Sequence, residues 1–111
     1  MRIQIASAAI AGTLVLVAGV AHAALDDAKA QELMKSGGCV ACHSVDKKLV
    51  GPAYKDVAQK RKGEKDAIAT LEKAVRAGSN GAYGKIPMPP NSKEKISDSD
   101  LHNLIEWVLS K

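Results

Sequence analysis

Apolar side chains recur at helical spacing near the middle of the chain. Ile68, Leu71 and Val75 stand at positions i, i+3 and i+7, which places them on one face of a helix. Gly78 follows where a helix commonly ends, because glycine easily adopts the backbone conformation found just after a helix. The pattern therefore predicts an amphipathic helix between residues 66 and 77.

A second apolar stripe, near the carboxyl end, predicts another helix. It follows Ser97, which together with Asp100 resembles the capping box that starts many helices. The members of the stripe are Leu101, Leu104, Ile105 and Val108. Their spacing gives the helix one apolar face, which we expect to pack against the rest of the protein.

Two further helices are predicted from start and stop signals. Asp26 or Asp27 can cap a helix that runs to about Ser36, where a pair of glycines ends it. Pro52 marks the start of a short helix that extends to Arg61. No segment shows the sustained alternation of apolar and polar side chains that is typical of strands. We therefore predict an all-α fold.

The composition leaves little material for a hydrophobic core. The 111 residues include no Phe, one Trp and two Tyr. A small domain buries a limited fraction of its surface and is marginally stable by itself. We therefore expect a bound apolar group to complete the core, and the chain to fold poorly without that group.

The strongest chemical signal is the run Cys39-Val40-Ala41-Cys42-His43. C-x-x-C-H is the attachment signature of c-type haem, in which the thiols add across the haem vinyl groups and the imidazole binds the iron. A structural zinc site would need further ligands, and a redox dithiol would belong near a βαβ pattern. A disulfide would leave His43 without a role. The motif therefore predicts one haem c, with its iron, attached to Cys39 and Cys42 and ligated by His43.

A second metal ligand is predicted in the loop Ile86-Pro87-Met88-Pro89-Pro90-Asn91. A methionine sulfur is a soft ligand that raises the reduction potential of haem and suits electron transfer. The prolines restrict the loop, and a residue between prolines is a poor candidate for core packing. Met34 stands too near Cys39 to reach the opposite haem face, and His102 is interpreted as an ordinary, partly exposed histidine. We therefore predict Met88 as the sixth ligand of the iron.

The first residues have the pattern of a secretory signal. Arg2 is followed by an apolar stretch over residues 8–21 and by Ala21-His22-Ala23, which resembles a cleavage site. The apolar stretch is short for a bilayer span of about 20 residues, although an uncleaved anchor is the alternative. We therefore predict a signal peptide over residues 1–23, one domain over residues 24–111, export to the periplasm and no stable membrane insertion.

The motifs together resemble those of a known family. The chain is similar to the small monohaem class I cytochromes c of bacterial respiratory and denitrifying chains, in the segments C-V-A-C-H, V-G-P-A-Y-K-D-V-A, G-S-N-G-A-Y-G-K-I-P-M-P-P-N and W-V-L-S-K. The resemblance spans essentially all of residues 24–111. It implies that family's fold, with the first and last helices crossing beside a haem that has one exposed edge. It also implies His/Met axial ligation.

The resemblance implies roles for single residues around the haem. Pro52 matches the proline whose carbonyl accepts a hydrogen bond from the axial histidine, a contact that fixes the orientation and basicity of the ring. Asn91 matches the residue whose side chain hydrogen-bonds near the axial sulfur. Trp107 matches a tryptophan of the last helix that packs inside the fold.

The chain departs from the family pattern where relatives bind the haem propionates. Tyr83 stands where many relatives have a tryptophan that binds a propionate, and a tyrosine donates at a different reach. Ala74 stands where one branch has a propionate-binding arginine. Either Lys73 or Arg76 substitutes for that arginine, or the propionate is more solvated in this chain. Arg61 replaces an apolar or aromatic residue. The propionate contacts of this chain are therefore open.

Two functions are compatible with a bound haem. An electron carrier retains both axial ligands, whereas a haem enzyme or a gas or redox sensor needs a displaceable sixth ligand. The proline-rich loop around Met88 and the lack of a plausible distal acid–base pair favour the carrier. We predict a soluble, monomeric, periplasmic one-electron carrier that is not an enzyme. Its expected donor is a quinol-oxidising complex, and its expected acceptor is a terminal oxidase or a nitrite reductase.

The charge distribution bears on those partners. The formal net charge is +4, and basic side chains crowd the stretch after the haem motif, at Lys47, Lys48, Lys55, Lys60, Arg61, Lys62 and Lys65. This run is either a solvated face or a basic docking surface that steers an acidic redox partner towards the haem. Nucleic acid is not expected as a partner, because the basic run lacks interleaved aromatic residues.

Overall fold

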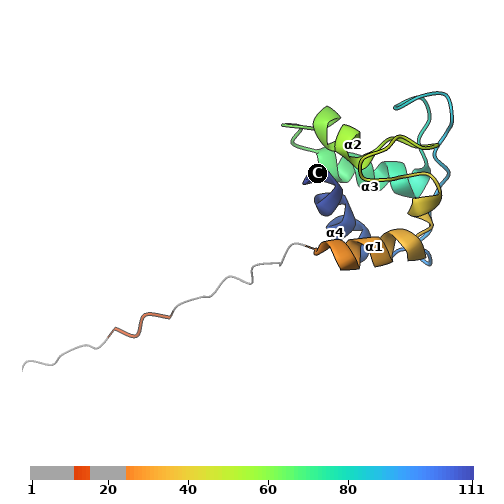
Figure 1. The fold of residues 1–111 in the computed structure, drawn as a ribbon. Helices are drawn as coiled ribbons and strands as arrows, with labels where there is room; N and C mark the ends of the chain where they lie inside the picture. The colour runs from red at the N-terminus through yellow and green to blue at the C-terminus, as the bar shows by residue number, and fades with distance from the viewer. Residues whose placement is uncertain (1–11, 16–24) are drawn as a thin grey trace, which may run out of the picture.

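The computed structural model describes residues 12–15 and 25–111. The signal peptide predicted over residues 1–23 lies outside the described residues, apart from residues 12–15. The described part forms four α-helices and one short 3₁₀ helix (Figure 1), namely α1 (Asp27–Ser36), η1 (Cys39–Ala41), α2 (Tyr54–Lys60), α3 (Ala67–Ala77) and α4 (Asp98–Leu109). Its one β feature is an isolated bridge, so the all-α prediction is confirmed for these residues.

The helix ends are set by the local signals in the sequence. The side chain of Asp26 accepts a hydrogen bond from the amide of Lys29 at 2.7 Å and caps α1. Ser97 caps α4 in the same way, by accepting a hydrogen bond from the amide of Asp100 at 3.1 Å. Gly78 ends α3 with a φ of 81°, a conformation that favours glycine.

The second helix is shorter than predicted. We expected it to begin at Pro52 and to extend to Arg61, but α2 begins at Tyr54 and ends at Lys60. Ala53 has an extended backbone, with φ −63° and ψ 145°. The carbonyl of Pro52 accepts a hydrogen bond from the side chain of His43 and not from a helix amide. This contact with His43, which lies outside the predicted helix, therefore delays the start of α2.

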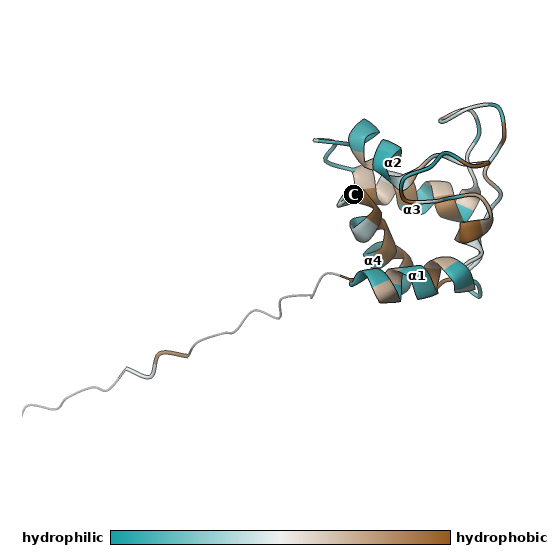
Figure 2. Ribbon diagram, in the orientation of Figure 1, coloured by the Kyte–Doolittle hydropathy of each residue, from teal (hydrophilic) through white to brown (hydrophobic). Residues whose placement is uncertain are grey.

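Helix α4 is the centre of the fold and contacts α1, α2 and α3. Its predicted apolar stripe is buried, and in Figure 2 the apolar residues of α4 face the other helices. The stripe of α3 is only half-buried against the core, because Leu71 and Val75 also line a cavity. Trp107 of α4 is 6% exposed and meets the ring of Tyr54 edge-on, with centroids 6.1 Å apart.

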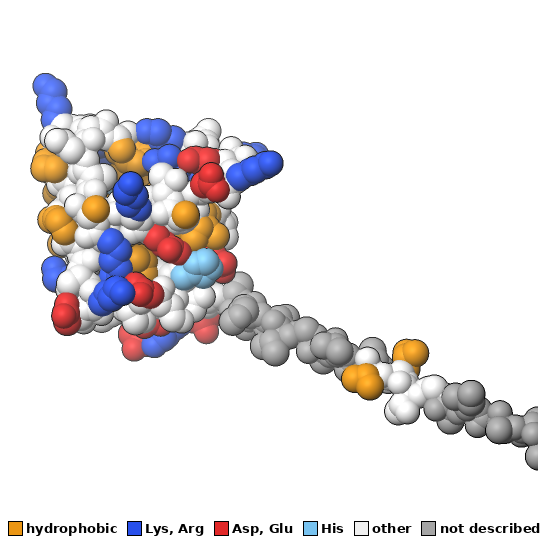
Figure 3. Space-filling model, turned by 180° about the vertical axis from the view of Figure 1, so that it is seen from behind, with side chains coloured by type: hydrophobic (Ala, Val, Ile, Leu, Met, Phe, Trp, Pro, Cys, Tyr) orange, Lys and Arg blue, Asp and Glu red, His pale blue; other side chains and the backbone are white. Residues whose placement is uncertain are grey.

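The surface carries charges of both signs. On the face seen from behind, basic and acidic side chains are interspersed (Figure 3). His102 is an exposed residue between two carboxylates, with Nδ1 at 2.7 Å from Glu72 and Nε2 at 3.1 Å from Glu106, in agreement with its interpretation as an ordinary histidine. Within the described residues, no helix combines the length and apolar character needed to cross a bilayer.

Candidate haem site

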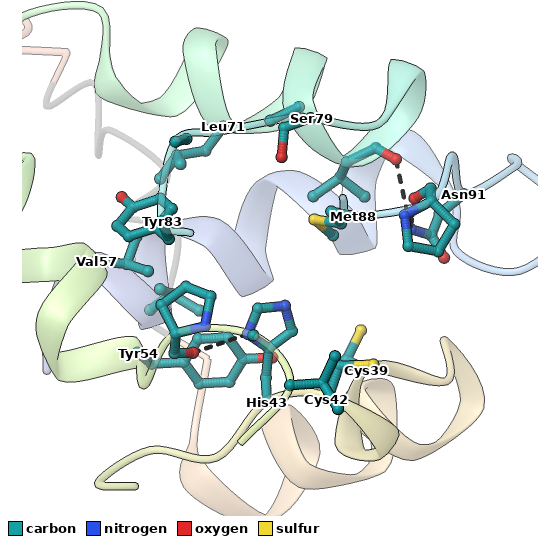
Figure 4. Close-up of a pocket in the computed structure, with 18 of the residues that line it drawn as sticks. Cys39, Cys42, His43, Tyr54, Val57, Leu71, Ser79, Tyr83, Met88 and Asn91 are labelled. Atoms are coloured by element: carbon teal, nitrogen blue, oxygen red, sulfur yellow. Dashed lines mark hydrogen bonds between the residues drawn. The ribbon is translucent and has the colours of Figure 1, made fainter. Parts of the chain in front are cut away.

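A cavity of about 440 Å³ lies between the helices and the loop that follows α3. Apolar side chains from α2, α3 and α4 form much of its wall. The side chains of Cys39, Cys42, His43 and Met88 all line it, although they come from two segments far apart in the sequence. The fold therefore gathers the four predicted haem and iron ligands around one apolar space (Figure 4).

The two cysteines and the histidine are presented by a tight turn that the sequence pattern did not predict. Gly38 adopts a left-handed conformation and starts η1. The amides of Cys42 and His43 then both donate to the carbonyl of Cys39, at 3.1 and 2.9 Å. Both thiols are free. In Figure 4 their sulfur atoms lie together at one end of the cavity, beside the histidine ring.

The imidazole of His43 is oriented by a backbone carbonyl. Nδ1 lies 2.8 Å from the carbonyl oxygen of Pro52, which can only accept a hydrogen bond. Nδ1 therefore carries the proton and donates it to this bond, which leaves the lone pair on Nε2. That nitrogen points into the cavity in Figure 4. The arrangement suits a metal-binding histidine, whose second nitrogen donates to a carbonyl or carboxylate.

Two neighbours that sequence reasoning missed also hold the ring of His43. Tyr54 stacks against it, with ring centroids 5.2 Å apart and planes 18° from parallel. On another side lies Gly51, where an added Cβ would come within 2.6 Å of the His43 Cε1 atom. The scarcity of aromatic side chains in the sequence is the signal that could have identified Tyr54, which is one of only two tyrosines. Nothing in the sequence pattern indicated the close approach of Gly51.

Met88 lies on the wall opposite His43 (Figure 4). Its loop is tied to the segment after α3 by an isolated antiparallel bridge. The amide of Met88 donates to the carbonyl of Ser79 at 2.8 Å, and the amide of Ser79 donates to the carbonyl of Met88 at 3.1 Å. The flanking prolines restrict the same backbone further. The thioether therefore extends into the cavity from a well-held loop.

Asn91 supports this loop through its backbone contacts. Its side-chain amide donates to the carbonyls of Pro89, at 3.1 Å, and Val75, at 3.4 Å. Its own backbone amide also donates to Val75, at 2.9 Å. The described residues contain no hydrogen bond from Asn91 to the sulfur of Met88. The side chain thus bonds near the predicted ligand by fastening the residue that follows Met88.

The residues considered for propionate binding lie in different places. Tyr83 lines the cavity at the end away from the two cysteines (Figure 4). Arg76 does not line the cavity, because its guanidinium donates to Asp98 at 2.8 Å and to the carbonyl of Ser92 at 3.0 Å. Lys73 is exposed and also lies outside the lining. Neither of them therefore reaches the cavity as a substitute for the family arginine.

The side chains around the cavity fit a covalent haem. The site offers paired thiols beside an imidazole with a free lone pair, a thioether on the opposite wall and apolar side chains between them. An imidazole nitrogen and a thioether sulfur are ligands that suit haem iron. No group of three or more His, Cys, Asp and Glu side chains that could hold another metal occurs within the described residues. The donor set therefore favours haem over zinc.

The chain is similar to known proteins of one family. The family model described as Cytochrome c matches residues 28–111. Cytochrome c-551 of Pseudomonas aeruginosa is 52% identical over 79 residues, which cover 71% of this chain and 73% of that protein. The segment matched by the family model contains both the cysteine motif and the methionine loop.

Solved structures have the same fold. The crystal structure of wild-type Nitrosomonas europaea cytochrome c552 has a TM-score of 0.67 at 44% identity and covers 72% of this chain and 96% of that chain. The crystal structure of the Class 1 cytochrome MtoD from Sideroxydans lithotrophicus has a TM-score of 0.64 at 36% identity, covering 73% of this chain and 90% of that chain. The chain therefore belongs to the cytochrome c family and has the class I cytochrome c fold.

Proposed function

We propose that this protein is a one-electron carrier in which His43 and Met88 are the axial ligands of a haem attached to Cys39 and Cys42. The observation that supports this most is the position of His43 and Met88 on opposite walls of one apolar cavity, with both thiols at its end. When bound, the haem supplies an iron that takes up and releases one electron. As a member of the cytochrome c family, the protein carries one covalent c-type haem and transfers electrons.

The residues of the chain have separate tasks in this proposal. Pro52 keeps the proton on Nδ1 of His43, so that Nε2 is available to the iron. Tyr54 and Gly51 hold the ring in place. The bridge between Ser79 and Met88 holds the opposite ligand. Ligands held this firmly stay in place in both oxidation states, and little reorganisation accompanies electron transfer.

The same rigidity argues against a haem enzyme or a gas or redox sensor. Those functions need an iron position that is vacant or easily vacated. Met88 is fixed by paired backbone hydrogen bonds and by prolines on both sides, and Asn91 fastens the residue that follows it. We therefore propose that the protein is not an enzyme and that Met88 stays bound.

Replacement of the methionine tests the ligand assignment. The unmutated ferric protein should be low-spin and show the weak near-infrared sulfur-to-iron band. Met88→Ala should lose the band, lower the reduction potential and let carbon monoxide bind to the ferrous protein. Met34→Leu is the control, because Met34 is buried, does not line the cavity and is exchanged for a residue of similar volume. Rapid carbon monoxide binding by the unmutated protein would instead favour the enzyme or sensor.

Export and covalent attachment can be tested together. We propose that residues 1–23 are a signal peptide and that the mature protein begins near Ala24 in the periplasm. Its mass should exceed that of the polypeptide by one haem, and haem staining should survive denaturing electrophoresis. Joint replacement of Cys39 and Cys42 by alanine should abolish the stain. A mature mass equal to the bare polypeptide would refute the attachment.

The protein exchanges electrons with redox partners, and we propose that they dock at the cavity mouth. Leu49, Val50 and Ile86 line the cavity and are 48%, 51% and 65% exposed. Lys48 and Lys85 are exposed residues that also line it. An apolar opening beside positive charge suits a transient complex with an acidic protein. We propose a quinol-oxidising complex as donor, a terminal oxidase or nitrite reductase as acceptor, and a monomeric carrier between them.

A further inference from the structure

Arg61 and Tyr83 bring two buried polar atoms to the same cavity. Arg61 follows the end of α2, Tyr83 lies in the loop that leads to Met88, and both line the cavity. The Nε atom of Arg61 and the hydroxyl of Tyr83 are buried and have no hydrogen-bond partner among the described residues. Because a buried donor without an acceptor is unfavourable, an acceptor is expected at this end of the cavity.

The two groups are close neighbours, but they do not satisfy each other. Tyr83 is the largest cause of the raised pKa of Arg61, followed among the attractive contacts by Glu64, yet the two groups form no hydrogen bond of normal geometry. Glu64 binds the outer part of the guanidinium, with its carboxylate oxygens 3.2 and 3.3 Å from Nη1. The side chain of Arg61 is 19% exposed. The buried Nε–H is therefore left for another acceptor.

A haem attached to the two cysteines would supply that acceptor. The vinyl groups and the propionates occupy opposite edges of the haem macrocycle. Attachment of the vinyl edge to Cys39 and Cys42 would direct the carboxylates away from these cysteines. Tyr83 lies at that far end of the cavity in Figure 4. A carboxylate is an acceptor that suits both a guanidinium and a phenol.

No other arginine of the described chain competes for this role. The Nε atom of Arg76 is also buried without a partner, but Arg76 does not line the cavity, and the rest of its guanidinium donates to Asp98 and to backbone carbonyls. Ala74 lines the cavity but has no donor in its side chain. The remaining cations of the lining, Lys48 and Lys85, are exposed.

We propose that Arg61 binds a haem propionate through its Nε–H, with the hydroxyl of Tyr83 as a second donor to the same carboxylate. The proposal rests on the covalent haem of the proposed function and assigns the residue that holds its carboxylate edge. An arginine keeps its charge at any physiological pH and forms strong, charge-assisted hydrogen bonds with carboxylates. Arg61 is thus a positioning residue that also places positive charge near the iron.

The test compares the vibrational spectrum and the reduction potential of holoprotein variants. In Arg61→Gln, the propionate bending band of the resonance Raman spectrum should shift to lower frequency, because the carboxylate loses a donor. The reduction potential should fall, because a nearby positive charge favours the reduced haem. Arg61→Lys keeps the charge and should restore much of the potential but not the band position. Lys62→Gln removes one charge from the adjacent exposed residue and should leave the band unchanged.

Two further variants keep the proposal falsifiable if Arg61→Gln folds poorly. Tyr83→Phe retains the ring and should shift the band in the same direction by a smaller amount. Glu64→Gln should leave the band in place. If Arg61 serves only as the surface partner of Glu64, Arg61→Gln and Glu64→Gln will lower the unfolding temperature alike and neither will move the band, which overturns the proposal. A protein without haem stain would refute the proposed function, whereas a stained protein with an unmoved band refutes only the role of Arg61.

Discussion

The indole of Trp107 donates a hydrogen bond to the carboxylate of Asp27 at 2.9 Å and so joins the last helix to the first. Lys111 adds a second contact to the same carboxylate at 3.1 Å, and its ammonium lies 4.3 Å from the centroid of the indole ring. The interaction links the two ends of the cytochrome domain. Neither Asp27 nor Trp107 lines the haem cavity, but the indole also meets the ring of Tyr54, which stacks on His43, so Asp27 is the partner whose replacement stays farther from the proposed iron ligands.

We predict that this contact makes the protein sensitive to acid. The hydrogen bond from Trp107, followed by the one from Lys111, holds the pKa of Asp27 below its usual value of 3.8. A lowered pKa contributes stability that is present above the unfolded value and is lost as the pH falls through the folded value. Asp27→Ala should therefore lower the unfolding temperature at neutral pH, with a smaller difference from the unmutated protein in strong acid.

Circular dichroism melts of the holoprotein across the acid range measure this effect. Trp107→Phe and the double variant complete a mutant cycle, which isolates the coupling between the two side chains. Additive effects of the two single changes would mean that the contact contributes nothing to stability.

The contact between His102 and Glu72 predicts the opposite dependence on pH. The hydrogen bond to Glu72, with a smaller contribution from Glu106, raises the pKa of His102 above its usual value of 6.5. A raised pKa contributes stability that is complete below the unfolded value and is lost as the pH rises through the folded value. The difference in unfolding temperature between the unmutated protein and His102→Gln should therefore shrink from about pH 5 to about pH 8.

The partner variant serves as the control for this prediction. Glu72→Gln removes the main acceptor on α3 and should abolish most of the same dependence, while the visible spectrum stays unchanged. A difference that stays constant over the range would show that the pair does not link α3 to α4.

Replacing Gly78 and Gly81 in turn by alanine distinguishes the effect of backbone strain from the loss of support for the methionine loop. Gly78 and Gly81 have φ values of 81° and 80°, so replacement by alanine strains both backbones by about 1–3 kcal/mol. An added Cβ at Gly78 would lie 2.7 Å from the carbonyl oxygen of Met88, whereas the one at Gly81 would meet nothing within 4 Å. Both variants should lose stability, but only Gly78→Ala should weaken the near-infrared band and lower the reduction potential. Equal spectra for the two would show that Gly78 does not support the ligand loop.

The lysines at the cavity mouth should accelerate reaction with anions. Lys48 is an exposed residue that lines the cavity, whereas Lys73 is exposed on α3 outside it. Lys48→Glu should slow oxidation of the ferrous protein by ferricyanide more than Lys73→Glu does, although both change the net charge equally. The difference between the oxidation rates of the two variants should become smaller at an ionic strength of about 0.1 M, because screening then limits the electric field of the lysine to about 10 Å. Stopped-flow rates measure this, and equal rates would mean that only net charge matters.

The basic run itself is less uniform than the sequence implied. Lys55 forms an ion pair with Asp46, and Lys60 donates to the carbonyl of Ala82 and lies 4.2 Å from the centroid of the Tyr83 ring. Lys47 and Lys62 are exposed. Clustering of lysines along the sequence therefore does not define a docking face, because some of these side chains contact other residues of the same chain.

The sequence alone determined the features that depend on neighbours within a few residues. The caps at Asp26 and Ser97 and the stop at Gly78 act within one turn, so the ends of three helices were predicted closely. The stripe of the last helix was predicted for the same reason. The cysteine motif predicts haem attachment from five consecutive residues. The family resemblance extends this prediction to the fold of the whole domain.

Only the tertiary structure decided which distant residues meet. The delayed start of α2, the closeness of Gly51 to His43 and the pairing of Ser79 with Met88 arise from contacts between segments that are not neighbours in a helix. The directions of Arg61 and Arg76 likewise depend on which acceptor each guanidinium reaches after the helices have packed. Long side chains explore many rotamers, and their partners are chosen by burial and hydrogen-bond geometry, which no local pattern of residues records.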